Sequence, residues 1–258
     1  MSEHVAPTWI VAAASVQGTA HVLNDLPCQD ASRIEALPDG WLLAVVSDGA
    51  GSAIRADAGA STACGGVAEY VQRAFDPSAA GADDLERLLT EAVGVAADRI
   101  RAQASQEGLA PRDFACTLLV LLVGPERSAI AHIGDGAIVA RRGDVTGVVS
   151  WPVQGQFANE TDFLTDDLAL VRMNLQPGLP ALDMVALFSD GLQHLLLDYA
   201  AKGPHLPFFE RHFAAIAERP RMPAELASAR LATYLASDSL RARADDDLTL
   251  VLAVRALG

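Results

Sequence analysis

The sequence predicts an α+β protein in which helices cover two antiparallel β-sheets. Its elements run as strands, two helices, strands, two helices and a final strand, which does not suit a parallel sheet with one helix after each strand. Short Gly-Asp-Gly and Arg-Gly-Asp turns join several strands, as in antiparallel hairpins. Of the 258 residues, 51% are hydrophobic, so the chain can bury the core that two sheets need. We expect residues 1–258 to form a single domain.

The individual elements follow from hydrophobic pattern and from Gly and Pro positions. Apolar segments bounded by Gly or Pro predict the first strands, at 8–16, 31–37 and 40–48. Two helix-compatible stretches follow, at 53–75 and 82–107. Further strands are expected at 114–124, 128–135, 137–144, 146–151, 184–190 and 248–256. The remaining segments are helices around 191–218 and 223–240, and a polar, irregular excursion at 152–181.

Composition and charge disfavour several classes of protein. A formal net charge of −14 disfavours binding to nucleic acid or to anionic membrane surfaces. No apolar stretch reaches the roughly 18 residues that span a bilayer, and the N-terminus shows no basic region followed by an apolar one. Cys28, Cys64 and Cys116 are odd in number and widely spaced, which fits a reducing compartment and predicts a cytoplasmic protein.

Aspartates stand at the boundaries of several predicted strands. Two distant apolar segments end in the same Ser-Asp-Gly, which places Asp48 and Asp190 directly after strands. Asp135 ends a third strand, and the triple aspartate 245–247 immediately precedes the last one. If these strand ends lie side by side, several carboxylates share a small volume, where they repel one another unless a cation lies among them.

Clustered carboxylates of this kind suit hard divalent cations. Mg²⁺ and Mn²⁺ prefer oxygen ligands, and they keep water molecules when the protein supplies only a few. Two such ions about 3.5–4 Å apart can activate water for in-line hydrolysis of a phosphate ester. A glycine after the aspartate lets the backbone approach an ion closely, so that a carbonyl can serve as a ligand.

Each motif taken alone has a simpler interpretation. The segment 134–136 is more often a hairpin turn than a metal site, and a triple aspartate is more often a solvated loop. Residues 49–54 imitate a dinucleotide-binding fingerprint but lack its third glycine. The sequence shows no P-loop, nucleophile elbow, zinc-like histidine spacing or activated cysteine, so covalent catalysis is unsupported and metal-activated water remains. His132, inside an apolar strand, is predicted to be packed or hydrogen-bonded.

The order of these motifs resembles that of the metal-dependent serine/threonine protein phosphatases, the type 2C family, and within it the compact bacterial branch. The resemblance runs nearly end to end, over "SVQG" with "CQDAS", "VVSDGAGS", "ACTLLVLLV", "HIGDGAIV", "LFSDGL" and "DDDLTLVL". Six short motifs in the right order make it specific. It implies a four-layer α–β–β–α sandwich, in agreement with the element order. "FANETDFLTD", residues 157–166, is similar to a stretch of the bacterial branch and is assigned no catalytic role.

The resemblance implies a centre of two Mg²⁺ or Mn²⁺ ions, with a weaker third. Asp48 would bridge two ions, and the carbonyl of Gly49 would bind one of them. Asp190 and Asp246 would be further ligands, and Asp135 would help to hold the third ion. The expected catalytic residues are therefore Asp48, Asp190 and Asp246.

The resemblance also implies roles for residues around these ligands. Asp30 would contact metal-bound water, and Gln29 stands where many members have glutamate. Asp247 follows the ligand Asp246 where the family usually has asparagine. The family's phosphate-binding arginine is missing, and His21 in its place is expected to contact substrate phosphate. The alternative is that His21 packs or caps the strand end and another group, such as Arg55, reaches the phosphate.

The predicted function is hydrolysis of phosphoserine or phosphothreonine in proteins by metal-activated water, without a phosphoenzyme, in signalling that opposes a serine/threonine kinase. Two alternatives stay open: a catalytically silent module that binds phosphoproteins, and a phosphatase for small phosphoesters. The complete set Asp48, Asp190 and Asp246 argues against the silent module. Hydrolysis of an aryl phosphate with and without Mn²⁺, followed by a phosphopeptide panel, distinguishes these functions.

Overall fold

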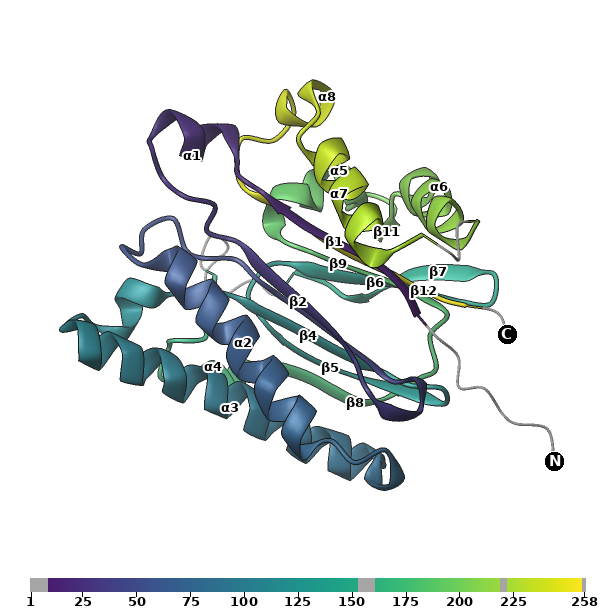
Figure 1. The fold of residues 1–258 in the computed structure, drawn as a ribbon, viewed down its shortest axis with the longest axis horizontal. Helices are drawn as coiled ribbons and strands as arrows, with labels where there is room; N and C mark the ends of the chain where they lie inside the picture. Colours follow the sequence, from purple (N-terminus) through teal and green to yellow (C-terminus); the bar gives the residue numbers. More distant parts are fainter. Residues whose placement is uncertain (1–8, 153–160, 219–221, 257–258) are drawn as a thin grey trace.

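A computed structural model describes residues 9–152, 161–218 and 222–256 as two stacked β-sheets with helices on both outer faces (Figure 1). The first sheet has the order β1-β12-β9-β6-β7. Its strands are β1 (Trp9–Val16), β12 (Leu248–Arg255), β9 (Met184–Phe188), β6 (Ala137–Arg142) and β7 (Val145–Ser150). The second sheet has the order β2-β3-β4-β5-β8. Its strands are β2 (Ala31–Ala36), β3 (Leu42–Ser47), β4 (Leu118–Val123), β5 (Arg127–Ile133) and β8 (Asn174–Pro180).

Each sheet carries one pair of longer helices. The second sheet is covered by α2 (Ala56–Ala74) and α3 (Ala82–Glu107), and the first by α6 (Leu206–Ala217) and α7 (Ala224–Leu235). The shorter elements are α1 (Thr19–Leu23), η1 (Pro38–Gly40), η2 (Pro77–Ala79), η3 (Pro111–Phe114), α4 (Ala169–Arg172), η4 (Asp190–Leu192), α5 (Gln193–Leu196), β10 (Leu197–Asp198), β11 (Gly203–Pro204) and α8 (Asp238–Arg241). None of the described helices is long and apolar enough to cross a bilayer.

Alternating side chains divide the interior into three hydrophobic layers. On β12, Leu250 and Leu252 face the helices of the first sheet, whereas Val251 and Ala253 face the second sheet. This follows from the period of two along a strand, which sends successive side chains to opposite faces. The layer between the sheets is buried and shared by both. That shared core supports the expectation of a single domain over residues 1–258, which stays a prediction.

The predicted fold class is confirmed, because both sheets are antiparallel and lie between helical layers. Two local expectations are wrong, and one element was not anticipated. The excursion 152–181 contains the edge strand β8, which tolerates its Pro and Gly because an edge strand has one side free of ladder bonds. The helix expected over 191–218 is interrupted by the small hairpin of β10 and β11. The short helix α1 was not expected.

The strand register brings distant strand ends to one end of the sandwich. Phe188, the last residue of β9, pairs with Leu250 near the start of β12 and with Ala137 at the start of β6. In the other sheet, Ser47 at the end of β3 pairs with Ala31 at the start of β2. The segments that carry the predicted aspartates therefore leave the two sheets at the same end.

Candidate active site

Asp48 lies in a loop that β3 and the segment before β4 hold in place. The backbone N–H of Asp48 donates to Oγ1 of Thr117 at 3.0 Å, and the N–H of Thr117 donates back to the carbonyl of Asp48 at 2.8 Å. The Ser47 hydroxyl donates to the carbonyl of Thr117 at 2.6 Å. These bonds fix the backbone on both sides of Asp48, so its carboxylate has a defined direction at the strand end.

Asp190 follows β9 and begins the turn η4. The preceding Ser189 is buried, and its hydroxyl donates to Oδ2 of Asp30 at 2.8 Å. The same hydroxyl accepts the backbone N–H of Thr249 at 3.1 Å. Ser189 thus joins the end of β9, the start of β12 and Asp30 in one network.

Glycine is required after both aspartates because another part of the backbone lies close by. A Cβ atom on Gly49 would lie 2.6 Å from the carbonyl oxygen of Ala56, and one on Gly191 would lie 2.2 Å from that of Asp247. Both distances are far below van der Waals contact. The close approach at Gly191 brings the Asp190 turn directly against the segment that precedes β12.

The carboxylates influence one another strongly. Burial, followed by the charges of Asp30 and Asp190, raises the pKa of Asp48 well above its usual value. Burial also raises the pKa of Asp190, against a hydrogen bond with the Asp48 carboxyl that lowers it. The pKa of Asp30 is raised by burial too, although hydrogen bonds from Thr249 and Ser189 act in the opposite direction. Without a cation, the cluster therefore tends to hold protons.

Several oxygens of the cluster are buried without a hydrogen-bond partner among the described residues. They include Oδ1 of Asp190, Oδ1 of Asp30 and Oε1 of Gln29. A buried oxygen acceptor with no donor is costly unless a cation, water or ligand meets it. Within the described ranges, no three His, Cys, Asp or Glu side chains are arranged as a ready-made metal cage. Such a cluster suits a hard cation that keeps part of its water shell.

Asp246 and Asp135 lie at the edges of this cluster. Asp246 is exposed, its Oδ1 accepts the N–H of Asp247 at 2.8 Å, and its charge contributes to the raised pKa of Asp48. Oδ2 of Asp135 accepts the hydroxyl of Thr161 at 2.7 Å, and its charge contributes to the raised pKa of Asp190. The two carboxylates therefore interact electrostatically with Asp48 and Asp190, respectively.

Asp247 is a buried anchor for the segment before β2. Its Oδ1 accepts the N–H of Gly18 at 2.7 Å, and its Oδ2 accepts the N–H of Gln29 at 2.5 Å. The carbonyl of Gln29 in turn accepts the N–H of Gly49 at 3.1 Å. Through this chain of bonds, Asp247 connects the start of β12 to the Asp48 loop.

The predicted phosphate contact, His21, faces Asp247. Its Nδ1 lies 2.9 Å from Oδ1 of Asp247, and its side chain is 12% exposed. The ring is not aligned for a hydrogen bond at that distance, so the contact is one of proximity. Arg55, the alternative, forms an ion pair with Glu107 and lies over the ring of Phe114. Which of the two contacts phosphate stays a prediction.

Sequence reasoning missed most of the hydroxyl groups that position the carboxylates. The hydroxyls of Thr117, Ser189 and Thr161 hydrogen-bond to a carboxylate or to the backbone beside one, and the Thr249 side chain acts on the Asp30 carboxylate. The repeated serine before Asp-Gly was the available signal for one of them. Residues 157–160 of the stretch typical of the bacterial branch lie outside the described residues.

His132 has the structural role that its apolar strand suggested. It is fully buried, and its Nδ1 lies 2.7 Å from the hydroxyl oxygen of Ser150. Burial lowers the pKa of His132 to about 4, so the ring is neutral at neutral pH.

Comparisons with known proteins identify the family of this chain. The family described as "Protein phosphatase 2C" matches residues 17–236. "Serine/threonine-protein phosphatase 3" of Escherichia coli (strain K12) is 36% identical over 254 residues, which is 96% of this chain and 98% of that protein.

Solved structures show the same fold. The serine/threonine phosphatase Stp1 from Staphylococcus aureus superimposes with a TM-score of 0.68 at 15% identity, over 98% of each chain. The catalytic domain of the phosphatase PstP, in complex with two manganese ions, gives a TM-score of 0.62 at 18% identity, over 97% of this chain and 100% of that one. Both matches confirm the four-layer sandwich.

Proposed function

The chain belongs to the protein phosphatase 2C family and is a serine/threonine protein phosphatase, and from that premise we propose that its reaction centre is the carboxylate cluster at the strand ends. The observation that carries this proposal is the mutual perturbation of buried carboxyl groups. Asp48 and Asp190 come from different sheets, yet each raises or lowers the other's pKa. Such perturbation is common where a site binds cations or moves protons.

Mg²⁺ or Mn²⁺ fits the donor set. The residues that would hold two ions are Asp48, the Gly49 carbonyl, Asp190 and Asp246, with Asp135 toward a weaker third. The unpartnered Oδ1 of Asp190 supports this, as does the close packing that leaves no side chain after either aspartate. When bound, such ions supply an activated water and neutralise charge on the phosphoryl group. The related PstP domain, described with two manganese ions, supports the same choice.

The chain's own residues position and accept protons around that water. Asp30 is held by the Ser189 hydroxyl through Oδ2, while its Oδ1 has no partner among the described residues. Oδ1 of Asp30 can therefore accept a hydrogen bond or a proton from a water beside Asp48 and Asp190. The backbone of Gln29, one residue earlier, is held by Asp247. Its side-chain oxygen is a neutral acceptor, whereas a carboxylate at this position would repel the neighbouring aspartates.

Phosphate recognition is proposed to involve His21, with Arg55 as the alternative. The ion pair of Arg55 with Glu107 is partly exposed, and such pairs are worth about 0–1 kcal/mol, so Arg55 can exchange that partner for phosphate. KM for an aryl phosphate, measured across a pH series in His21→Ala and Arg55→Ala, separates the two. The variant that raises KM removes the phosphate contact.

The substrate class and setting are proposed from the same site. We propose phosphoserine and phosphothreonine proteins as substrates, opposing a serine/threonine kinase in cytoplasmic signalling. Cys28, Cys64 and Cys116 are all free, which supports a reducing compartment. The retention of all three expected ligands argues against a silent binding module.

The decisive experiment is chelation and metal return. EDTA should abolish hydrolysis of an aryl phosphate, and Mn²⁺ should restore it. A phosphopeptide panel then tests for preference over small phosphoesters. Full activity of a preparation shown to be free of metal would overturn the proposed centre, and equal activity on small phosphoesters and phosphopeptides would overturn the proposed substrate class.

A further inference from the structure

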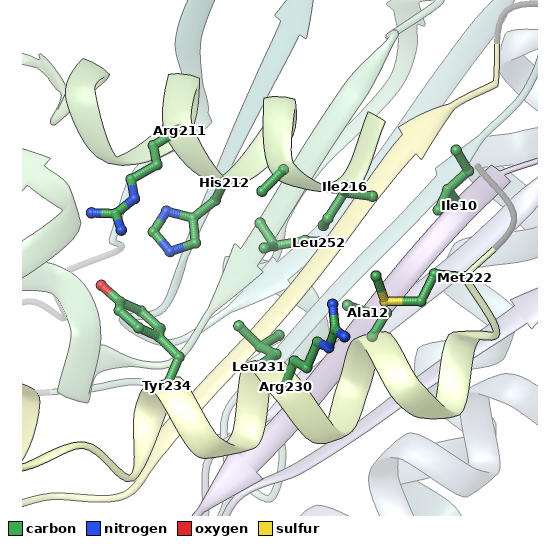
Figure 2. Close-up of a pocket in the computed structure, with 12 residues that line it drawn as sticks. Ile10, Ala12, Arg211, His212, Ile216, Met222, Arg230, Leu231, Tyr234 and Leu252 are labelled. Carbon is green, nitrogen blue, oxygen red and sulfur yellow. The ribbon is translucent and has the colours of Figure 1, made fainter. Parts of the chain in front are cut away.

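A cavity of about 240 Å³ lies between α6 and α7, above β1 and β12 (Figure 2). Its apolar walls come from both helices and both strands, including Ile216, Leu231, Leu252 and Ala12. A second cavity of about 250 Å³ adjoins it and shares Arg211, His212 and Tyr234.

The cavity exists because the two helices rest on the sheet with little contact between them. On the opposite face, α2 and α3 pack closely, and a Cβ on Gly66 would lie 3.0 Å from the Cα of Ala96. By contrast, α6 and α7 meet through the rings of His212 and Tyr234, whose centroids are 4.9 Å apart. Below them, β1 presents the small side chain of Ala12, so no described residue fills the gap.

The rim of this cavity is cationic, although the chain as a whole is strongly anionic. Arg211 and Arg230 line the first cavity and Arg243 lines the second. Among the described residues, none of these three arginines forms an ion pair, and neither cavity is lined by an aspartate or glutamate. Against a net charge of −14, this concentration of unpaired positive charge favours an anionic ligand.

Three polar side chains gather at one end of the cavity, whereas a fourth, Arg230, lies among the apolar ones. Figure 2 shows Arg211, His212 and Tyr234 converging there, with the apolar side chains extending away from them. His212 places Nδ1 2.8 Å from the carbonyl of Phe208 and stacks on that residue's ring at 4.0 Å. Its orientation is therefore fixed by α6 itself.

The hydroxyl of Tyr234 is available at the same end. It forms no hydrogen bond with the described residues. Burial raises the pKa of Tyr234, while the charges of Arg211 and Arg243 act to lower it, which reflects the nearness of both guanidinium groups. A guanidinium and a phenol at one end of an apolar cavity match a carboxylate head and a hydrocarbon body.

We propose that this cavity binds a small organic carboxylate with an apolar body, such as a medium-chain fatty acid. The carboxylate lies against Arg211 and Tyr234, and the chain lies over Leu231 and Leu252. The site is separate from the proposed reaction centre, because Leu252 lies four residues along β12 from its first residue, Leu248, roughly 13 Å away, and Asp246 precedes that strand.

Octanoate is the probe, and octan-1-ol is its uncharged counterpart. Titration calorimetry of the whole chain should show saturable binding of octanoate, with octan-1-ol at least about tenfold weaker, since a hydrogen bond to a charged group is worth about 1.5–3 kcal/mol. Arg211→Gln should weaken octanoate about tenfold while leaving octan-1-ol unchanged. Ala12→Leu should fill the cavity and weaken both ligands.

Two controls keep the result interpretable. Arg101→Gln removes an equivalent charge from the opposite helical layer and should leave octanoate binding unchanged. Metal-dependent hydrolysis of an aryl phosphate should be unchanged in every variant, which shows that each one is folded. Equal affinity for octanoate and octan-1-ol, or no octanoate binding, overturns the proposal. A dimer that Ala12→Leu dissociates in sedimentation also overturns it, by showing that a second copy covers the cavity.

Discussion

The two Ser-Asp-Gly segments, residues 47–49 and 189–191, have one sequence but two kinds of support. Ser47 donates its hydroxyl to a backbone carbonyl, that of Thr117, and so braces a neighbouring strand. Ser189 donates to the carboxylate of Asp30 and accepts from the backbone of Thr249, so it is part of the proposed reaction centre. A repeated tripeptide therefore identifies equivalent positions in the two sheets without giving its side chains equivalent roles.

The largest loss of kcat is expected for the aspartate that both segments share. Asp48→Asn and Asp190→Asn each remove a charge from the proposed metal centre. Each should lower kcat by roughly 10³-fold or more, as for loss of a principal catalytic group. The measurement is steady-state hydrolysis of an aryl phosphate at saturating Mn²⁺.

The matched control for these variants is Asp39→Asn, in η1 at the far end of β2 and β3. Asn tolerates the left-handed backbone of that residue, so kcat should not change. A loss below tenfold in either centre variant would contradict the equivalence of the two aspartates.

The next effect concerns the glycines. Gly49→Ala and Gly191→Ala each place a Cβ against backbone, and overpacking of this kind costs about 1–3 kcal/mol of unfolding free energy. Gly191→Ala should cost more, because its contact is the shorter and lies on Asp247, which holds Gly18 and Gln29.

Urea denaturation measures both losses. Gly65→Ala, in α2 with open space around it, is the control and should be neutral or slightly stabilising. If Gly49→Ala loses more unfolding free energy than Gly191→Ala, the backbone around the Asp190 turn adjusts to an added Cβ more easily than its geometry indicates.

The two serine variants should differ in their effect on kcat, whereas the two aspartate variants should have similar effects. Ser47→Ala should lower stability by about 1 kcal/mol and leave kcat unchanged, since it removes a backbone brace. Ser189→Ala should lower kcat as well, because Asp30 loses the donor that orients it. Urea denaturation and steady-state kinetics of both variants test this expectation. Equal losses of kcat would show that the two serines do not have different roles.

The smallest effect is a pH dependence of stability in metal-free protein. The raised pKa values of Asp48 and Asp190 mean that the folded state binds protons that the unfolded state releases. That contribution is present below the usual carboxyl pKa of about 3.9 and is lost as pH rises through the folded pKa.

The test compares variants, because His132, whose pKa is lowered to about 4, acts with the opposite sign. In EDTA, the unfolding free energy of the wild type minus that of Asp190→Asn should fall as pH rises from 4 to 8, and Mn²⁺ should reverse the fall. A difference that stays constant across the series would show that the Asp190 carboxyl is not perturbed by its neighbours.

Most of the fold was predictable because it depends on local patterns. The apolar strands bounded by Gly or Pro and the 3.6-residue spacing of α3 appear directly in the sequence, and α3 begins and ends where that spacing does. The edge strand β8 was missed because Pro177 and Gly178 are turn formers, and its pairing with β5 depends on contacts over long sequence distances.

The clustering of the candidate site's aspartates was predictable from the sequence, but the orientation of its side chains was not. Asp48 and Asp190 stand at strand ends, so their position follows from register. The direction of His21 depends on Asp247, which is more than two hundred residues away in the chain and buried by strands that pair only in the folded state. No local pattern encodes such a contact.

In the proposed centre, Asp247 also sets the point in synthesis at which the site can first assemble. It holds Gly18 across 229 positions of sequence and Gln29 across 218, while β12 pairs with β1 along the whole of that strand. A chain still being synthesised, with β12 inside the ribosome, lacks this anchor and the adjacent Asp246. Synthesis proceeds at about 5–20 residues per second, so the time needed to add the residues up to the end of β12 is long compared with the elementary steps of folding. If the proposed centre carries the reaction, the growing polypeptide therefore has no phosphatase activity until translation has delivered its final described strand.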